Sequence, residues 1–290
     1  MNKIIQRLII FVVGIPLITL IVLGLPHYHH LALNILVIIF SALGAIELSD
    51  LLRKKDMAIP RWEAALLGIL GPASVTAVVS FNINSEAIQA FFIAGASWLL
   101  VSRIFSKNEG LKTGITRAAA GFAVMVYPGV FLEWIIKMAR WEVEGSSSAA
   151  QIFILFFLLI VFANDSAAWA AGMLFGKGNR GIIPASPNKS IAGFVGGVCA
   201  SIIVAVTGAL LFPEVFVPHY LGAIPSGIIV GLLSGIAATL GDLGESVMKR
   251  SADTKDSGSL IPGRGGVLDS IDSIALAAPV FYCACLIFFI

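Results

Sequence analysis

Residues 152–174 read IFILFFLLIVFANDSAAWAAGML, an apolar run interrupted by Asn164, Asp165 and Ser166. A helix of this length crosses the hydrocarbon core of a bilayer, which is roughly 30 Å thick. Similar runs recur along the chain, which is 58% hydrophobic and 12% charged, with a mean hydropathy of +0.95. An ordinary soluble domain is about one quarter charged. The composition therefore predicts an integral membrane protein.

The apolar runs predict the fold class, an all-α polytopic transmembrane helical bundle of about nine spans. Helices are expected because unpaired backbone groups cannot face lipid. The fourth run is the shortest. The predicted spans are residues 8–25, 31–48, 64–81, 87–101, 118–136, 152–174, 191–212, 221–243 and 274–290.

Basic residues predict the orientation, because cytoplasmic loops are enriched in Lys and Arg. With a cytoplasmic N-terminus, only Lys137 and Arg140 of the 19 Lys and Arg residues fall outside. The C-terminus is then extracytoplasmic. The first run starts with Lys3 and Arg7, like a signal peptide, but residues 25–28 offer no small-residue cleavage site, so we expect a retained helix. A bacterial inner (cell) membrane is the predicted location.

The two parts of the chain use polar residues differently. Residues 1–145 predict an N-terminal transmembrane bundle of about five spans with short basic loops. Its main ionisable residue within a span is Glu47, for which pairing with Arg53 or Lys54 and a functional role both stay open. Residues 146–290 predict a C-terminal catalytic transmembrane domain of about four spans, with site loops facing the cytoplasm.

Several function classes are excluded. The basic residues are spread over many loops without interleaved aromatics, so nucleic-acid binding is not expected. No Gly-x-x-x-x-Gly-Lys-Ser/Thr phosphate loop is present. All four histidines are predicted in outside loops, which excludes an inward Ser-His-Asp arrangement and leaves zinc binding at residues 27–30 as a minor alternative. The three cysteines, in apolar spans, are predicted to be small core residues.

Asn164 and Asp165 are costly inside a membrane helix unless they have a partner or water. A structural pairing is open, but we favour a polar cavity in which both contact substrate. The following loop contains Ser186 and Lys189 before a Gly-rich helix start. Backbone N–H groups at such a start, beside Lys189, would suit an anion, although a simple basic loop is the alternative.

The eighth span ends with Asp242, Glu245 and Lys249. If the helix continues, their spacing of i, i+3 and i+7 places them along one face. We expect the two acids and the base to emerge together at the cytoplasmic surface.

The segment after that helix combines acids, bases and glycines. Glycines allow a close approach of backbone to a ligand. Carboxylates suit Mg²⁺, and Lys and Arg neutralise phosphate charge. Metal-assisted nucleotidyl transfer at a membrane surface needs such a set, whose members are Asp242, Lys249, Arg250, Lys255, Asp256, Arg264, Asp269 and Asp272.

At these residues the sequence resembles the phosphatidate cytidylyltransferase family. Its C-terminal signature runs Lys-Arg, four residues, Lys-Asp-x-Gly, a Pro-Gly-His-Gly-Gly turn and Asp-Arg-x-Asp. This chain has Lys249-Arg250, Lys255-Asp256-Ser257-Gly258, Pro262-Gly263-Arg264-Gly265-Gly266 and Asp269-Ser270-Ile271-Asp272. Elements around Asn164, Ser186 to Ser190 and Gly241 to Ser246 are also similar, so the match covers residues 163–273.

The resemblance implies roles for these residues. Asp242 and Asp269 would hold the catalytic metal pair, with Mg²⁺ the main ion, a second cation such as K⁺ an open alternative, and Asp256 a further candidate ligand. Lys189, Lys249, Arg250 and Lys255 would bind the phosphates of CTP and phosphatidate, and Ser186 and Ser246 would position them. Arg264 is a further candidate for substrate binding. The resemblance also implies a homodimer with a cytoplasm-facing cavity.

Three residues depart from the family pattern. Arg264 replaces the His of the glycine turn, Ser270 replaces the Arg after the signature Asp, and Ile191-Ala192 replaces Trp-Glu. Arg264 could supply the cation lost at Ser270, which we state as a hypothesis. A catalytically inactive family member is therefore an alternative.

The resemblance implies transfer of a cytidylyl group from CTP to phosphatidate in the inner leaflet, giving CDP-diacylglycerol for phospholipid synthesis. A CTP-dependent lipid kinase, or a cytidylyltransferase for another lipid phosphate, could use the same groups. An ion-coupled transporter using Asp165 and Asp242 is the alternative from another class.

Overall fold

In the computed structural model, residues 10–104, 108–144 and 146–289 are described, and no strand occurs within these ranges. Lys3, Arg7 and Lys107, which the predicted orientation places on the cytoplasmic side, lie outside the described residues. The all-α class is confirmed for the described part of the chain.

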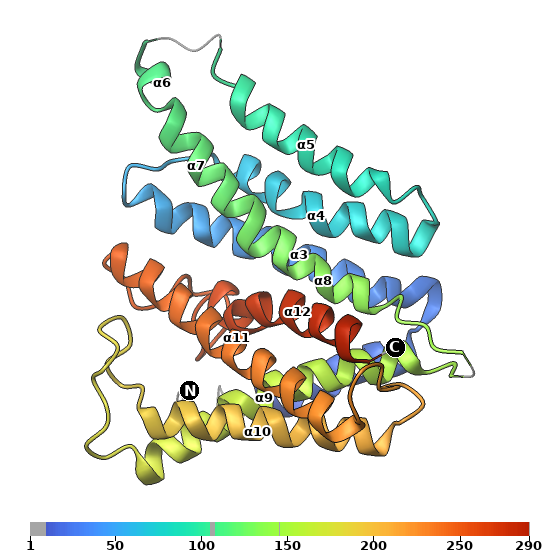
Figure 1. The fold of residues 1–290 in the computed structure, drawn as a ribbon. Coiled ribbons are helices and arrows are strands. Elements are labelled where there is room, and N and C mark those ends of the chain that lie inside the picture. Colours follow the sequence, from blue (N-terminus) through green and yellow to red (C-terminus); the bar gives the residue numbers. More distant parts are fainter. Residues whose placement is uncertain (1–9, 105–107, 145, 290) are drawn as a thin grey trace. The chain divides into compact units, whose positions relative to one another are not determined.

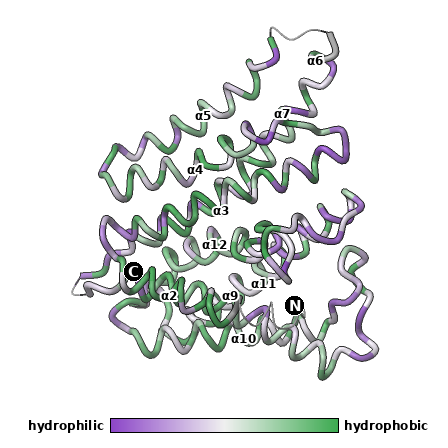
Figure 2. Tube along the Cα trace, turned by 180° about the vertical axis from the view of Figure 1, so that it is seen from behind, coloured by the Kyte–Doolittle hydropathy of each residue, from purple (hydrophilic) through white to green (hydrophobic). Residues whose placement is uncertain are grey.

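The helices follow one another along the chain, and the longer connections are those between α9 and α10, α10 and α11, and α11 and α12 (Figure 1). Figure 2 shows hydrophobic colours along most helices and hydrophilic colours mainly in the connecting segments. In chain order the elements are η1 (Ile10–Gly14), α2 (Ile15–Gly24), α3 (His27–Arg53), α4 (Arg61–Phe81), α5 (Glu86–Val101), α6 (Asn108–Lys112), α7 (Gly114–Val124), η2 (Met125–Val130), α8 (Phe131–Met138), α9 (Ala149–Phe175), α10 (Ile191–Leu211), α11 (Ala223–Ser251) and α12 (Leu268–Phe288).

Seven helical segments of the described chain are long and apolar enough to cross a membrane. The chain is therefore an integral membrane protein. The first and fourth predicted spans correspond to shorter apolar helices, Val12–Gly24 and Glu86–Val101. The exact number of spans stays a prediction. The seven segments are α3, α4, Gly114–Met138, α9, α10, α11 and α12.

Helix α3 is assigned from His27, but it contains a kink before the predicted start of the second span at residue 31. Tyr28, His29 and His30 have φ angles of 51°, 50° and 58°, so the backbone is non-helical at these three residues. His30 is buried at this kink. The non-helical backbone at residues 28–30 agrees with the predicted connection before the second span, and the side of the membrane on which these histidines lie stays a prediction.

The chain forms two compact units. The first comprises the chain up to Lys137 together with Met248–Ile271, and the second comprises Met138–Val247 and Asp272–Ile290. The segment Met248–Ile271 thus belongs to the unit built by the N-terminal helices. The predicted division near residue 145 stays a prediction.

Small residues bring the helices of the first unit together. The Ser41 hydroxyl on α3 contacts two carbonyl oxygens, at 2.7 Å from Gly68 on α4 and 2.6 Å from Pro128 in η2. A Cβ at Gly68 would lie 2.5 Å from the Ala45 side chain. Close approach of three helical segments therefore depends on small side chains there.

A buried ion pair also connects helices of the first unit. Arg117 on α7 pairs with Glu63 on α4, and the Trp98 indole on α5 donates to Glu63 over 2.9 Å. The Glu63 side chain is only 1% exposed. Burial of these charges is acceptable because they are paired and hydrogen-bonded.

The second unit is organised around α9 and α10, which lie side by side in Figure 1. A Cβ at Gly197 on α10 would be 2.9 Å from the Asn164 carbonyl on α9. The Trp141 and Phe153 rings stack with centroids 4.0 Å apart. Close helix contact and aromatic packing form the core of this unit.

Candidate active site

The C-terminal end of α11 begins the signature segment. Helix α11 continues to Ser251, which confirms the condition for placing Asp242 and Lys249 on one helix. The chain then leaves the helix through Asp253, whose φ is 55°, and Thr254 donates its N–H to the Lys249 carbonyl over 2.9 Å. Lys249 is therefore held in a closed last turn.

A tight turn shapes the middle of the segment. Ile261 and Gly265 exchange backbone hydrogen bonds of 2.8 and 3.0 Å, with Arg264 in the turn between them. Gly265 has a φ of 113°, and a Cβ there would lie 2.5 Å from Asp269 Oδ2. Glycine is required at this position by conformation and by space.

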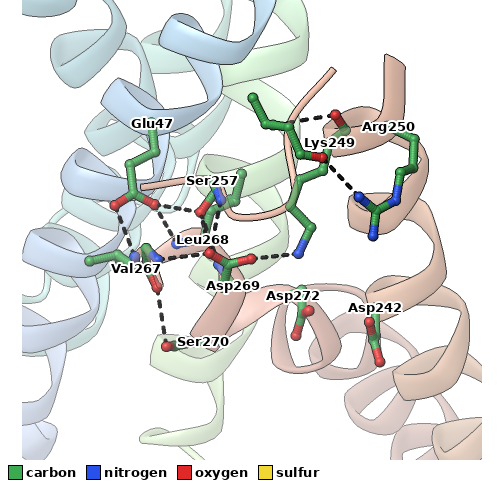
Figure 3. Close-up of polar contacts among 12 residues, drawn as sticks. Glu47, Asp242, Lys249, Arg250, Ser257, Val267, Leu268, Asp269, Ser270 and Asp272 are labelled. Carbon is green, nitrogen blue, oxygen red and sulfur yellow. Dashed lines mark hydrogen bonds and ion pairs between the residues drawn. The ribbon is translucent and has the colours of Figure 1, made fainter. Parts of the chain in front are cut away.

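Asp269, in the first turn of α12, is the centre of the cluster shown in Figure 3. Its Oδ1 lies 2.5 Å from the Lys249 ammonium. Its Oδ2 accepts hydrogen bonds from Gly266 N–H at 2.7 Å and Ser257 N–H at 2.9 Å, and lies 2.9 Å from the Ser257 hydroxyl. The carboxylate is thus fixed in orientation by groups of its own segment.

Glu47 on α3 contacts the same segment (Figure 3). It accepts the N–H groups of Val267 at 2.9 Å and Leu268 at 2.8 Å, and its Oε2 lies 2.9 Å from the Ser257 hydroxyl. Pairing of Glu47 with Arg53, one of the interpretations left open by the sequence, is not what the structure contains. Arg53 contacts Asp50 and the Ile59 carbonyl instead.

Among the remaining predicted residues of this segment, Asp256 lies close to Asp269. Lys255 and Asp256 are exposed, and the Asp256 Cβ adjoins the same face of Gly265 as Asp269. The Arg250 guanidinium donates to the Thr254 carbonyl over 3.2 Å. Arg264 is partly exposed in its turn. The first unit therefore gathers acids and bases of the signature in one region.

The second unit brings together two residues that were predicted separately, one for phosphate and one for metal. Lys189, before α10, lies 2.6 Å from Asp242 on α11, with both side chains about one third exposed. A Cβ at the adjacent Gly241 would be 2.4 Å from the Asp272 carbonyl oxygen. Asp242 thus lies near the backbone of the last signature acid.

Glu245 differs from the prediction. It is fully buried, although we expected it to emerge at the surface with Asp242. Ser246 is also buried, and Ser186 lies in the loop before α10. The spacing along the helix was correct, but a long helix can bury one residue of a polar face against its neighbours.

Asn164 is bonded entirely within its unit. Its amide nitrogen donates to the Ser201 hydroxyl at 3.1 Å and the Gly235 carbonyl at 3.2 Å, and its oxygen accepts from Thr239 at 3.3 Å. These partners come from α10 and α11. Asp165 is half-buried on the next position of α9.

The chemistry of the acids fits Mg²⁺. Within the described ranges, no three His, Cys, Asp or Glu side chains form a metal-binding group. Mg²⁺ nevertheless uses one or two carboxylates together with water and substrate phosphates. Asp269 and Asp242 each present an oxygen to a lysine ammonium, so each already faces a cation.

Comparison with known proteins defines the family. Residues 5–288 match the sequence model of the cytidylyltransferase family. The chain belongs to this family. It is accordingly a nucleotidyltransferase, and the signature segment around Asp269 lies within the matched region.

Its relatives include enzymes from several bacteria. A phosphatidate cytidylyltransferase of Bacillus subtilis is 28% identical over 84% of the chain and 86% of the relative. One from Staphylococcus haemolyticus is 40% identical over 74% of each chain. One from Synechocystis is 28% identical over 96% of the chain and 94% of the relative.

Proposed function

We propose that this protein transfers the cytidylyl group of CTP to phosphatidate, producing CDP-diacylglycerol and pyrophosphate. The observation that carries the proposal is the Asp269 cluster, in which an oriented carboxylate, Lys249 and a glycine-rich loop come together. The named activity of the bacterial relatives supports the choice of substrate.

The bases of the site bind phosphate. Lys249, Arg250 and Lys255, with Lys189, hold the phosphate oxygens of the two substrates by charge-assisted hydrogen bonds. Ser186, Ser246 and Arg264 contribute further contacts to substrate. Asp242, Asp269 and Asp256 would hold Mg²⁺, which would supply positive charge against the negative charge of the reacting phosphates. These contacts reduce repulsion between two polyanions.

The reaction is a direct displacement. A phosphate oxygen of phosphatidate bonds to the α-phosphorus of CTP while the bond to the pyrophosphate oxygen breaks, and pyrophosphate leaves with that electron pair. A phosphate monoester has a second pKa of about 6, so it is largely a dianion at neutral pH. The protein therefore needs to position groups rather than supply a strong base.

The proposal includes a location and an assembly. The basic loops support a cytoplasmic site, a cytoplasmic N-terminus and an extracytoplasmic C-terminus in a bacterial inner membrane. Nine spans, a homodimer, and a second cation such as K⁺ complete the proposal. Cysteine labelling of Lys137→Cys and Lys255→Cys variants in sealed vesicles tests the orientation. The proposed orientation predicts that only the cysteine at position 137 is labelled from the extracytoplasmic side.

Labelled CTP tests the reaction. Purified protein in detergent with Mg²⁺ and phosphatidate should move α-labelled phosphorus into lipid and release γ-labelled phosphorus as pyrophosphate. A lipid that carries the γ-label, with CDP released, would instead establish a lipid kinase. Label transfer with another lipid phosphate but not with phosphatidate would contradict the proposed acceptor. Absence of transfer to every lipid phosphate would indicate an inactive family member, with Arg264 and Ser270 as the first positions to restore.

A further inference from the structure

Glu47 lies in the part of the chain that does not carry the signature, yet its carboxylate is bonded to that signature. It and Ser257 are 210 residues apart in sequence. Its two oxygens accept the N–H groups of Val267 and Leu268. These groups lie at the start of α12, where backbone donors lack partners within the helix. Glu47 therefore caps α12 from another helix.

The cap is continuous with the candidate catalytic carboxylate. Gly266 donates its N–H to Asp269, whereas the next two residues donate theirs to Glu47. The Ser257 hydroxyl lies 2.9 Å from both carboxylates. It has one proton and can donate to one of them at a time. Movement of the Glu47 carboxylate would therefore change the hydrogen bonding of Asp269 directly.

The loop is shaped to admit this carboxylate. A Cβ at Gly258 would lie 2.4 Å from Glu47 Oε1, and one at Gly266 would lie 2.2 Å from Glu47 Oε2. Two glycines of the signature thus let the backbone approach Glu47 from different points of the loop. The negative charge also suits the positive end of the α12 dipole.

We propose that Glu47 is a positioning residue for the transfer reaction. It holds Ser257 and the start of α12 so that Asp269 stays aligned with Lys249. The role in catalysis rests on the proposed function, whereas the hold on the loop does not. Since a displacement of about 1 Å at a catalytic group can cost about 100-fold in rate, loss of Glu47 should lower kcat.

Three variants test this role. Glu47→Ala removes all acceptors, and Glu47→Gln keeps one acceptor oxygen and the side-chain length. Asp50→Asn is the matched control, because Asp50 lies one turn further along α3 and pairs with Arg61 outside the loop. Hydrogen exchange of the backbone amides and steady-state kinetics are measured for each.

The expected result is local. Glu47→Ala should lower kcat about 10- to 100-fold, with a smaller change in KM for CTP. Amide protection at residues 266–269 should fall while that of α9 and α10 is unchanged. Glu47→Gln should fall between Glu47→Ala and the wild type in both measurements, and Asp50→Asn should match the wild type. If Glu47→Ala does not fold, Glu47→Gln carries the test by itself.

Two results would overturn the proposal. One is wild-type protection at residues 266–269 in the Glu47 variants. The other is lost protection there with an unchanged kcat, which would make Glu47 a structural cap only. If the wild type transfers nothing to phosphatidate, the proposed function fails, whereas the exchange measurement still reports on the hold that Glu47 has on the loop.

Discussion

Two carboxylate–cation pairs in the first unit look alike but have different surroundings. Glu63 is bonded by the side chains of Arg117 and Trp98, which belong to neighbouring helices. Asp269 pairs with Lys249, and its other oxygen is bonded by a loop. Both acids are at least nine-tenths buried. Burial and charge therefore do not separate a structural pair from a candidate site.

What separates the pairs is the origin of the other donors. Asp269 receives two backbone N–H groups from a glycine-rich loop, next to the exposed Lys255 and Asp256. Such a carboxylate keeps its orientation when its lysine moves to a phosphate. Glu63 has only side-chain partners among the contacts described, so it depends on the cation itself. Backbone donors therefore distinguish a carboxylate that can exchange its lysine partner for a ligand from one that is fixed in a structural pair.

The largest predicted effect is on stability, at the first pair. Arg117→Ala should destabilise the protein by about 3–5 kcal/mol, because it leaves Glu63 charged and buried. The specific activity of the folded fraction should change little. Thermal unfolding in detergent measures this, with Arg61→Ala as the control at an exposed pair. If Arg117→Ala lowers the unfolding temperature no more than Arg61→Ala does, the Glu63–Arg117 pair is not a structural pair in the sense proposed.

The second pair should respond in the opposite way. Lys249→Gln should lower kcat/KM about 100-fold, because a cation facing the reacting phosphates is lost. Stability should fall less than in Arg117→Ala, since Asp269 keeps the donors of Ser257 and Gly266. Kinetics and unfolding are compared on the same preparation. Wild-type activity in Lys249→Gln would show that this pair is also structural.

A neutral network should give a smaller effect on stability alone. Asn164→Ala should cost about 1–3 kcal/mol, because it removes the buried hydrogen bonds of the amide to Ser201, Gly235 and Thr239. Specific activity should stay within about threefold of the wild type, which corresponds to less than 1 kcal/mol. Asn179→Ala, at a partly exposed asparagine with one hydrogen bond from its side chain, is the control. A greater loss of activity would restore Asn164 as a substrate contact.

The smallest effect is expected at the protein surface. Asp253 pairs with Lys55 at 3.0 Å, and its side chain is 87% exposed. Asp253→Asn should change the free energy of unfolding by less than about 1 kcal/mol. Asparagine also tolerates the positive φ at this position. A large loss of activity would mean that Asp253, beyond the end of α11, also belongs to the site.

The membrane character and the signature could be predicted because both depend on local sequence. Apolar runs gave the long helices, and the Lys249-to-Asp272 pattern indicated the segment that surrounds Asp269. The first and fourth spans were harder, because helices Val12–Gly24 and Glu86–Val101 are short. Hydropathy alone does not decide whether a short helix crosses the membrane.

Long-range contacts could not be predicted in the same way. Glu47 was recognised as an acid within a span, but the sequence near it suggested only Arg53 or Lys54 as partners. Its actual partners belong to a loop about 200 residues away, and such pairing depends on tertiary packing. Glu245 was misplaced for a related reason, because helical spacing gives a face but not what covers it.

We propose that the Asp269 cluster transfers a cytidylyl group to phosphatidate. The most direct measurement is incorporation of α-labelled phosphorus from CTP into lipid by the wild type, Asp269→Asn and Asp253→Asn, each folded to the same extent. We expect phosphatidate-dependent incorporation that is kept in Asp253→Asn and reduced about 100-fold or more in Asp269→Asn. Equal incorporation by Asp269→Asn and the wild type would contradict it.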